Sequence, residues 1–177
     1  MAKDLVTVIC PPYDIISPQL QRELYQRSEY NFVRLEHGRD LPQDTANDNK
    51  YTRSATTLEQ WLKQGIVEID KAPAIYLHDH YFTHHGKEYK RRGIIACVRL
   101  EEWDKMVIRP HEGTLDGPKT DRLSLLWICQ ANTSSILALY DDHEQQVSSL
   151  LAAQQRNRPI ISSSGDGEES HRVWAIT

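Results

Sequence analysis

Hydrophobic and polar residues alternate along several short stretches of the chain. Such alternation predicts β-strands, because successive side chains of a strand point to opposite faces of a sheet. Two of these stretches, residues 74–84 and 89–100, are separated by a short turn and predict a long antiparallel hairpin. Further β-rich stretches predict strands at residues 5–10, 31–37, 135–140, 159–163 and 171–176.

Other stretches repeat apolar residues at helical spacing. Ser17 followed by Pro18 is typical of a helix start and predicts a helix to about residue 27. An apolar stripe predicts an amphipathic helix within residues 47–64, which Gly65 ends. Residues 144–155 form another predicted helix.

The stretch 120–131 predicts a helix with one apolar and one polar side. Leu123, Leu126 and Trp127 share a face, so we expect that face to be buried. The side that carries Asp121 is then expected to face outward.

Helices and strands are interspersed, which predicts an α+β (mixed α/β) fold with a mostly antiparallel or mixed sheet, a central long hairpin and about four flanking helices. A length of 177 residues fits a single domain. The chain stops at Thr177 directly after a predicted strand. We therefore expect either a single domain or the N-terminal portion of a longer protein.

Charge and hydropathy exclude several classes of protein. The net charge of -4 provides no attraction for nucleic acid. No apolar run is long enough to cross a membrane, and the first residues lack the apolar segment of a signal peptide. These features predict a cytoplasmic protein, and they leave the oligomeric state open.

The densest group of polar residues lies just before and within the start of the helix predicted at 120–131. These residues offer an acid/base pair and cations for an anion at a helix start, and they favour a phosphate or carboxylate site. The alternative is a solvated loop in which Thr120 or Asp121 merely caps the helix. The candidate residues are Arg109, His111, Glu112, Thr114, Lys119, Asp121 and Arg122.

Two other stretches carry candidate binding residues. Tyr13 and Asp14 follow two prolines at a predicted strand-to-helix junction, which either lines a cleft or is only a rigid turn. Arg34 lies in the strand predicted at 31–37. A cation inside a sheet would need an anionic partner, either a carboxylate such as Glu112 or a ligand.

Histidines are concentrated in the predicted hairpin. His78 and His80 share a face of the first strand, which is compatible with a metal ion. Asp79 points to the other face, however, and His84 and His85 lie at the hairpin tip. Because no further ligand completes a coordination shell, we expect no metal site.

Several motifs follow one another along the chain, namely Cys10-Pro-Pro-Tyr-Asp-Ile-Ile-Ser17, Asn31-Phe-Val-Arg-Leu-Glu36, Arg92-Gly-Ile-Ile-Ala96, Pro110-His-Glu112, Gly117-Pro-Lys-Thr-Asp-Arg-Leu123 and Ala131-Asn132. Together they resemble the prokaryotic family called domain of unknown function 1015. The resemblance runs in order from about Val8 to Tyr140. Members of that family are about twice as long, and their second half carries an Asp-Gly-His-His-Arg motif that resembles free-serine kinases of the ParB and sulfiredoxin superfamily. That motif is absent here.

The resemblance implies that the whole protein is a phosphotransferase or another nucleotide-using enzyme linked to serine metabolism. As a kinase, it would act on a small hydroxylated metabolite and use ATP or ADP with Mg²⁺. Glu112 would accept the hydroxyl proton, and His111, Lys119 and Arg122 would hold substrate or phosphate charge. We place Asn132 among the binding residues. The chain by itself is expected to hold no cofactor and to be inactive. The alternative is a non-catalytic module that binds a metabolite or a partner protein.

Overall fold

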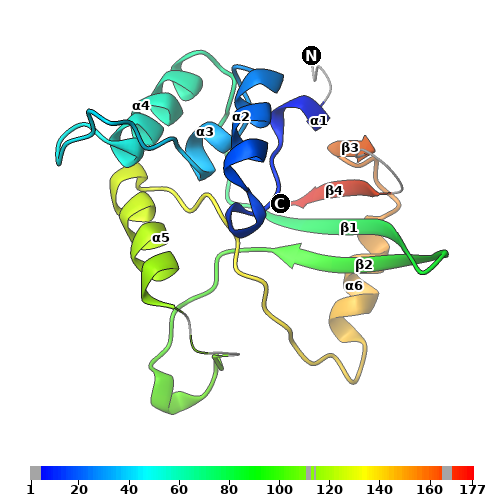
Figure 1. Cartoon of the computed structure of the whole chain (residues 1–177). Coiled ribbons are helices and arrows are strands. Elements are labelled where there is room, and N and C mark those ends of the chain that lie inside the picture. Colours follow the sequence, from blue (N-terminus) through cyan, green and yellow to red (C-terminus); the bar gives the residue numbers. More distant parts are fainter. Residues whose placement is uncertain (1–4, 111–112, 114, 165–168) are drawn as a thin grey trace. The chain divides into compact units, whose positions relative to one another are not determined.

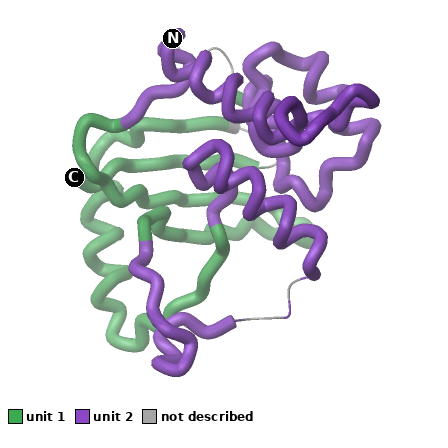
Figure 2. Tube along the Cα trace, turned by 90° about the vertical axis from the view of Figure 1, so that its left-hand side faces the viewer, with its two compact units in different colours: residues 1–6, 70–97, 136–177 green, residues 7–69, 98–135 purple. Residues whose placement is uncertain are grey.

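The computed structural model describes residues 5–110, 113, 115–164 and 169–177. These residues form six α-helices and a four-stranded antiparallel sheet, which confirms the expected α+β class (Figure 1). They divide into two compact units (Figure 2). Unit 1 comprises Asp70–Cys97, Ile136–Thr177 and the N-terminal residues up to Val6, and unit 2 comprises Thr7–Ile69 and Val98–Ser135. None of the described helices is long and apolar enough to cross a membrane.

The sheet of unit 1 contains the predicted hairpin. Strands β1 (Ile75–His84) and β2 (Lys87–Ile95) pair antiparallel along their lengths. His85 and Gly86 connect them with φ angles of 51° and 71°. Two consecutive positive φ angles are typical of the tight turns that match the twist of a hairpin. The second strand is shorter than predicted, because it ends at Ile95.

The other two strands come from the C-terminal part of the chain. Strand β4 (Ser170–Ile176) pairs with β1, and β3 (Ile161–Ser164) pairs with β4, so the order in the sheet is β2-β1-β4-β3. Both were predicted, with slightly different ends. Every neighbouring pair is antiparallel.

Helix α6 (Gln146–Gln154) packs against one face of this sheet. Its Leu151 joins Leu77 of β1 and Trp174 of β4 in a buried apolar cluster. Asp79, two residues after Leu77, points to the same face and is fully buried. The intervening residues of β1 therefore lie on the opposite face of the sheet.

Unit 2 consists of helices and connecting segments. The predicted cap of α2 is present, since the Ser17 hydroxyl accepts a hydrogen bond from the Leu20 amide at 3.2 Å. The prolines before it lead into a short 3-10 helix, η1 (Tyr13–Ile15). The α-helices of the unit are α2 (Pro18–Arg27), α3 (Val33–Glu36), α4 (Lys50–Lys63) and α5 (Asp116–Cys129).

Helix α4 has the start and the end that the sequence predicts. Asn49 caps it, and Asn49 and Thr52 bond reciprocally to each other's backbone amides. Trp61 on its apolar stripe is buried. Gly65 follows the helix with a φ of 69°, which a residue without a side chain adopts at little cost.

Three predicted strands are wrong. Residues 5–10 contain the one-turn helix α1 (Leu5–Val8), residues 31–37 contain α3, and residues 135–140 form no regular element. Asn31 explains the second case, because its side-chain oxygen accepts from the Val33 amide at 3.0 Å and turns the chain. Over so few residues, alternation does not distinguish a strand from a helical turn.

The buried face of α5 is the opposite of the predicted one. Leu125 is buried, whereas Leu123 and Trp127 are exposed, Trp127 by 74%. Asp121 and Arg122 lie on the inner side because charged partners meet them there. Helical spacing thus identified the two faces of α5 but not which of them is buried.

Truncating a side chain on the inner side of α5 should therefore lower the free energy of unfolding more than truncating one on the outer side. We expect Leu125→Ala to lower the free energy of unfolding by about 2–3 kcal/mol, as for other buried leucines. Trp127→Ala should change it by less than about 0.5 kcal/mol. Urea unfolding followed by circular dichroism measures both, and a larger loss for Trp127→Ala would contradict this placement of α5.

Candidate functional site

Three of the predicted site residues, Tyr13, Asp121 and Arg122, lie together in unit 2. The Arg122 guanidinium carbon lies 4.0 Å from the centre of the Tyr13 ring. The same guanidinium donates hydrogen bonds to Asp121 Oδ2, from Nε at 3.0 Å and from Nη2 at 2.5 Å. Asp121 and Arg122 thus form an ion pair on helix α5, and the Tyr13 ring of η1 packs against its guanidinium.

Arg122 also bonds twice to Glu36, at the end of α3. Its Nη1 donates to Glu36 Oε1 at 3.0 Å, and its Nη2 donates to the Glu36 carbonyl at 2.9 Å. The Glu36 side chain is only 5% exposed, and its Oε1 also accepts from the Ser134 hydroxyl. The other oxygen, Oε2, is buried without a hydrogen-bond partner among the described residues. Glu36 is therefore a buried carboxylate whose oxygen Oε1 is bonded to Arg122 and to the Ser134 hydroxyl.

Asp121 receives two further contacts from the start of α4. The Tyr51 hydroxyl donates to Asp121 Oδ1 at 2.8 Å, and Lys50 Nζ lies 3.2 Å from the same oxygen. Burial raises the pKa of Asp121, but hydrogen bonds from Arg122, Tyr51 and Lys50 outweigh burial, so the pKa is lower than usual. Burial likewise lowers the pKa of Lys50, yet its interactions with Asp121 leave it raised. Both groups are therefore charged at neutral pH.

These residues surround a small pocket with about 10 Å³ of free space, which is room for a water molecule but not for a metabolite. Burial and the nearby Lys50 lower the pKa of His37, so this side chain is neutral at pH 7. The two cations at the pocket already face carboxylates, Lys50 facing Asp121 and Arg122 facing Glu36. These contacts connect α3, α4 and α5. The pocket is lined by Leu35, Glu36, His37, Gly38, Lys50, Tyr51, Ser54, Asp121, Arg122 and Leu125.

Comparison with known proteins identifies the family. The model of one family, described as "Protein of unknown function (DUF1015)", matches residues 2–177, which is nearly the whole chain. The chain belongs to the DUF1015 family. This confirms the resemblance seen in the sequence motifs. No curated protein and no solved structure gives a significant match.

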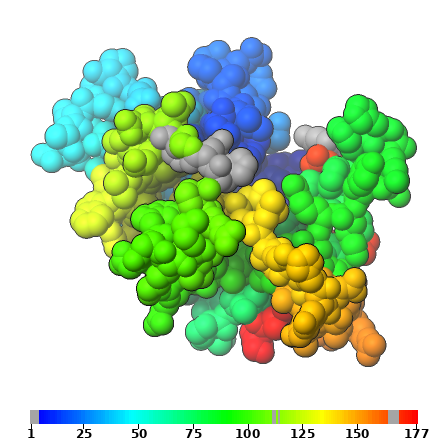
Figure 3. All heavy atoms as spheres, turned by 90° about the horizontal axis from the view of Figure 1, so that it is seen from below, coloured from blue at the N-terminus to red at the C-terminus, as the bar shows by residue number. Residues whose placement is uncertain are grey.

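In this DUF1015 chain, the start of α5 presents free polar groups. The helix begins at Asp116, four residues before the predicted start, so neither Thr120 nor Asp121 caps it. Pro118 fits the first turn, where its missing N–H costs no hydrogen bond. Leu115 precedes the helix and provides no side-chain cap. Figure 3 shows the lime-coloured surface of α5 beside the cyan segment that leads into α4.

Two predicted cations of the DUF1015 chain are exposed. Lys119 in the first turn of α5 is 65% exposed, and its Nζ lies 3.8 Å from Asp116. Arg109 is exposed, and its Nε donates to the Met106 carbonyl at 3.3 Å. Surface pairs of this kind are weak, so Lys119 stays available to an anion.

The remaining candidates lie apart or cannot be placed. Asp14 is exposed in η1, and Asn132 is exposed after the end of α5. His111, Glu112 and Thr114 lie outside the described residues.

The prediction that Arg34 lies inside a sheet is wrong. Arg34 belongs to helix α3, and its Nη2 donates to the Tyr25 carbonyl at 2.9 Å. Its guanidinium carbon also lies 4.4 Å from the centre of the Tyr25 ring. The described partner of this cation is thus a carbonyl with an aromatic ring, rather than a carboxylate.

Sequence reasoning missed Glu36, Lys50 and Tyr51 in the DUF1015 chain. Glu36 was assigned to a strand, and the other two were interpreted only as the start of an amphipathic helix. Only Glu36 has a local signal in the sequence, because it ends the motif Asn31-Phe-Val-Arg-Leu-Glu36. The contacts with Arg122 and Asp121 join residues 70 to 86 positions apart.

Proposed function

We propose that this chain is the N-terminal part of a phosphotransferase that uses ATP or ADP and a small hydroxylated metabolite such as serine. The proposal rests first on the motifs that resemble a family whose second half is similar to free-serine kinases. It rests also on the start of α5, where an anion would find suitable partners. We expect such an enzyme in the cytoplasm, where both nucleotides are available.

The first turn of α5 is the observation that carries the proposal. The free N–H groups at the start of a helix attract anions, and here those of Asp116 and Gly117 have no partner among the described residues, since Leu115 provides no side-chain cap. Pro118 has no N–H, and the Lys119 N–H donates to the Leu115 carbonyl at 3.2 Å. Lys119 adds an exposed positive charge in the same turn, and its exposed partner Asp116, 3.8 Å away, holds it only weakly. One turn further on, Arg122 is bonded to the buried Glu36. The helix is therefore fixed at Arg122 and open at its start, which suits a phosphate-binding role.

The other roles follow from the chemistry of phosphoryl transfer, which depends on positioning and on neutralising charge. Glu112 would accept the proton of the attacking hydroxyl, with His111 beside it in the chain. Mg²⁺ would enter together with the nucleotide, because Glu36 and Asp121 already face Arg122 and Lys50. Such a metal ion supplies charge neutralisation at the phosphates.

The outer face of α5 supports the idea that further protein completes the site. Leu123, Leu126 and Trp127 form an exposed apolar stripe, with Trp127 exposed by 74%. Apolar patches of this kind commonly mark contacts with other protein surfaces. We propose that the second half of the enzyme covers this stripe.

The test is an assay of phosphoserine formation from serine and ATP or ADP by the whole protein that contains this chain. Lys119→Ala should raise the KM for the nucleotide about tenfold with little change in kcat, because it removes a contact to bound phosphate. Glu112→Gln should lower kcat about 100-fold, because the general base is lost. The chain of residues 1–177 alone should show no turnover.

A lysine on another helix provides the matched control. Lys63 at the end of α4 is exposed and pairs with Glu59 four residues earlier, so Lys63→Ala should leave both kinetic constants unchanged. An unchanged KM in Lys119→Ala would remove α5 from the phosphate site. Robust turnover by residues 1–177 alone would refute a site completed by the second half.

A non-catalytic binding or regulatory module is the second candidate. The observation that favours it is the water-sized pocket, whose cations already face carboxylates. In that case the segment from Arg109 to Arg122 would recognise a metabolite or a partner protein. Calorimetry of the whole protein with ATP, ADP and serine distinguishes the two, because a module of this kind would give no heat with any of them.

A further inference from the structure

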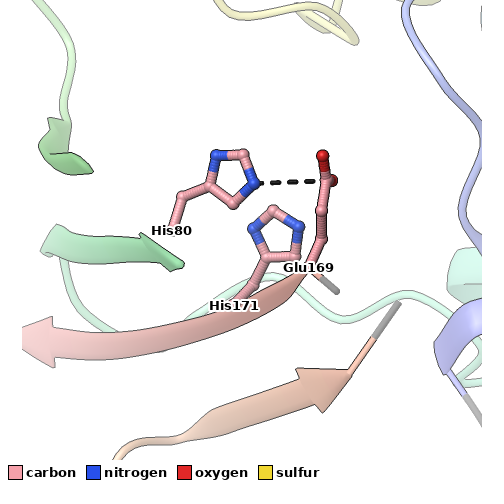
Figure 4. Close-up of side chains that lie close together, drawn as sticks. All are labelled: His80, Glu169 and His171. Carbon is pink, nitrogen blue, oxygen red and sulfur yellow. Dashed lines mark ion pairs between the residues drawn. The ribbon is translucent and has the colours of Figure 1, made fainter. Parts of the chain in front are cut away.

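Three histidines and a glutamate lie together in unit 1, on the face of the sheet opposite α6. His78 and His80 come from β1, His171 comes from β4, and Glu169 lies just before β4. The register of the two antiparallel strands places His80 directly opposite His171. Figure 4 shows His80, Glu169 and His171 with their side chains close together.

The nitrogen and oxygen atoms of this cluster converge. His80 Nε2 lies 3.4 Å from Glu169 Oε2, and one ligand atom from each of His80, Glu169 and His171 lies within 4.8 Å of the others. The rings of His80 and His171 are stacked, with 4.4 Å between their centres. His80 Nε2 is buried without a hydrogen-bond partner among the described residues. Glu169 lies within ion-pair distance of this buried nitrogen but makes no hydrogen bond with it, and a cation between the two groups would satisfy both.

We propose that His80, His171 and Glu169 bind a divalent transition-metal ion of the zinc type. Two imidazoles and one carboxylate suit zinc, whereas calcium and magnesium prefer oxygen ligands alone. Ligands about 2.1 Å from a tetrahedral ion lie about 3.4 Å from one another, which is the distance between His80 Nε2 and Glu169 Oε2. Three protein ligands leave the fourth position open for water or a substrate.

His78 fixes the orientation of the His171 ring. Its Nε2 lies 3.0 Å from Nδ1 of His171, so His171 keeps Nε2 for the metal and donates its Nδ1 proton to His78.

Arg91 competes with the metal. Its Nη2 lies 3.0 Å from Nδ1 of His80. A metal on Nε2 keeps the proton on Nδ1, and Nδ1 then cannot accept a hydrogen bond from Arg91. Arg91 is exposed and already lies 5.7 Å from the centre of the Phe82 ring, toward which it can turn. Arg91→Met should therefore tighten metal binding.

The experiment titrates the metal-free chain with Zn²⁺ in competition with a chromophoric chelator, and with Co²⁺ as a spectroscopic probe. We expect one ion per chain and the strong visible absorption of four-coordinate Co²⁺. His80→Ala and His171→Ala should each weaken Zn²⁺ binding by about 100-fold or more, and His78→Ala by about tenfold. Circular dichroism of the metal-free variants checks that the fold survives.

Two histidines outside the cluster serve as controls. His84 ends β1 and is exposed, and His143 is exposed beside Asp141, so alanine at either position should leave Zn²⁺ affinity unchanged. If a histidine variant fails to fold, Glu169→Gln tests the site instead and should weaken Zn²⁺ binding. Glu169 is 58% exposed, so this substitution cannot disturb a core. No saturable Zn²⁺ binding, or equal binding by His171→Ala and His84→Ala, would overturn the proposal. Because this site belongs to unit 1 and α5 to unit 2, either proposal can fail without the other.

Discussion

Replacing Arg122 with methionine is expected to lower the free energy of unfolding of the chain by about 3–5 kcal/mol at neutral pH, the usual cost of leaving a buried charge unpaired. The guanidinium donates to the carboxylate and the carbonyl of Glu36 and also to Asp121. Without it, the Glu36 carboxylate stays buried and loses the cation that lies against it. Urea unfolding followed by circular dichroism measures the loss.

The same substitution at Lys119 is the matched control. Lys119→Met on the exposed side of the same helix should change the free energy of unfolding by less than about 0.5 kcal/mol. Combining Glu36→Leu with Arg122→Met should destabilise less than Arg122→Met alone, because the double variant buries no unpaired charge. Equal stability of Arg122→Met and Lys119→Met would show that the contact with Glu36 contributes nothing.

The sequence indicated one side of this site but not the other. Asp121 and Arg122 stood out as charges near a helix start, and Tyr13 followed a pair of prolines. Their partners Glu36 and Lys50 could not be identified, because nothing local ties a residue to one far along the chain. The buried face of α5 was assigned wrongly for the same reason, since ion pairing buried its polar side.

Local signals did predict the elements that local interactions specify. The hairpin and α4 are long enough for their periodicity to be unambiguous, and α4 has its own cap at Asn49. The short segment 31–37 has no such length. Its conformation depends on Asn31, whose amide donates to the carbonyls of Thr7 and Ile9, more than 20 residues earlier.

The histidine cluster shows that a site assembled by strand pairing is also hard to predict from the sequence. His78 and His80 were recognised as sharing a face of a strand, but two nitrogens do not complete a coordination shell. His171 and Glu169 come into reach only because β4 pairs with β1 in one particular register. A shift of one residue would place His171 on the other face, and the sequence alone does not give that register.

Replacing Arg92 with methionine should lower the free energy of unfolding of unit 1 by about 3–5 kcal/mol at neutral pH, because it leaves the fully buried carboxylate of Asp79 without its cation. Arg92 donates to both oxygens of Asp79, at 2.7 and 2.8 Å, and Gln155 of the segment after α6 donates to Oδ2 at 2.5 Å. Burial raises the pKa of Asp79, but Arg92, with help from Lys90 and Gln155, outweighs it and leaves the pKa below its usual value. Urea unfolding at a series of pH values tests both the loss and its cause.

The pH dependence separates this ion pair from simple packing. In the parent chain the lowered pKa of Asp79 means that its stabilisation is complete above the unfolded pKa near 4 and disappears as the pH falls through the folded pKa. In Arg92→Met, the largest contribution that offsets burial is lost, so the pKa of Asp79 rises and acid should relieve the buried charge. The stability difference between the two proteins should therefore shrink as the pH falls from 7 toward 4. Arg91→Met, on the opposite face of β2, should stay within about 0.5 kcal/mol of the parent chain throughout. A loss in Arg92→Met that is the same at every pH would show that Arg92 acts through packing rather than through its charge.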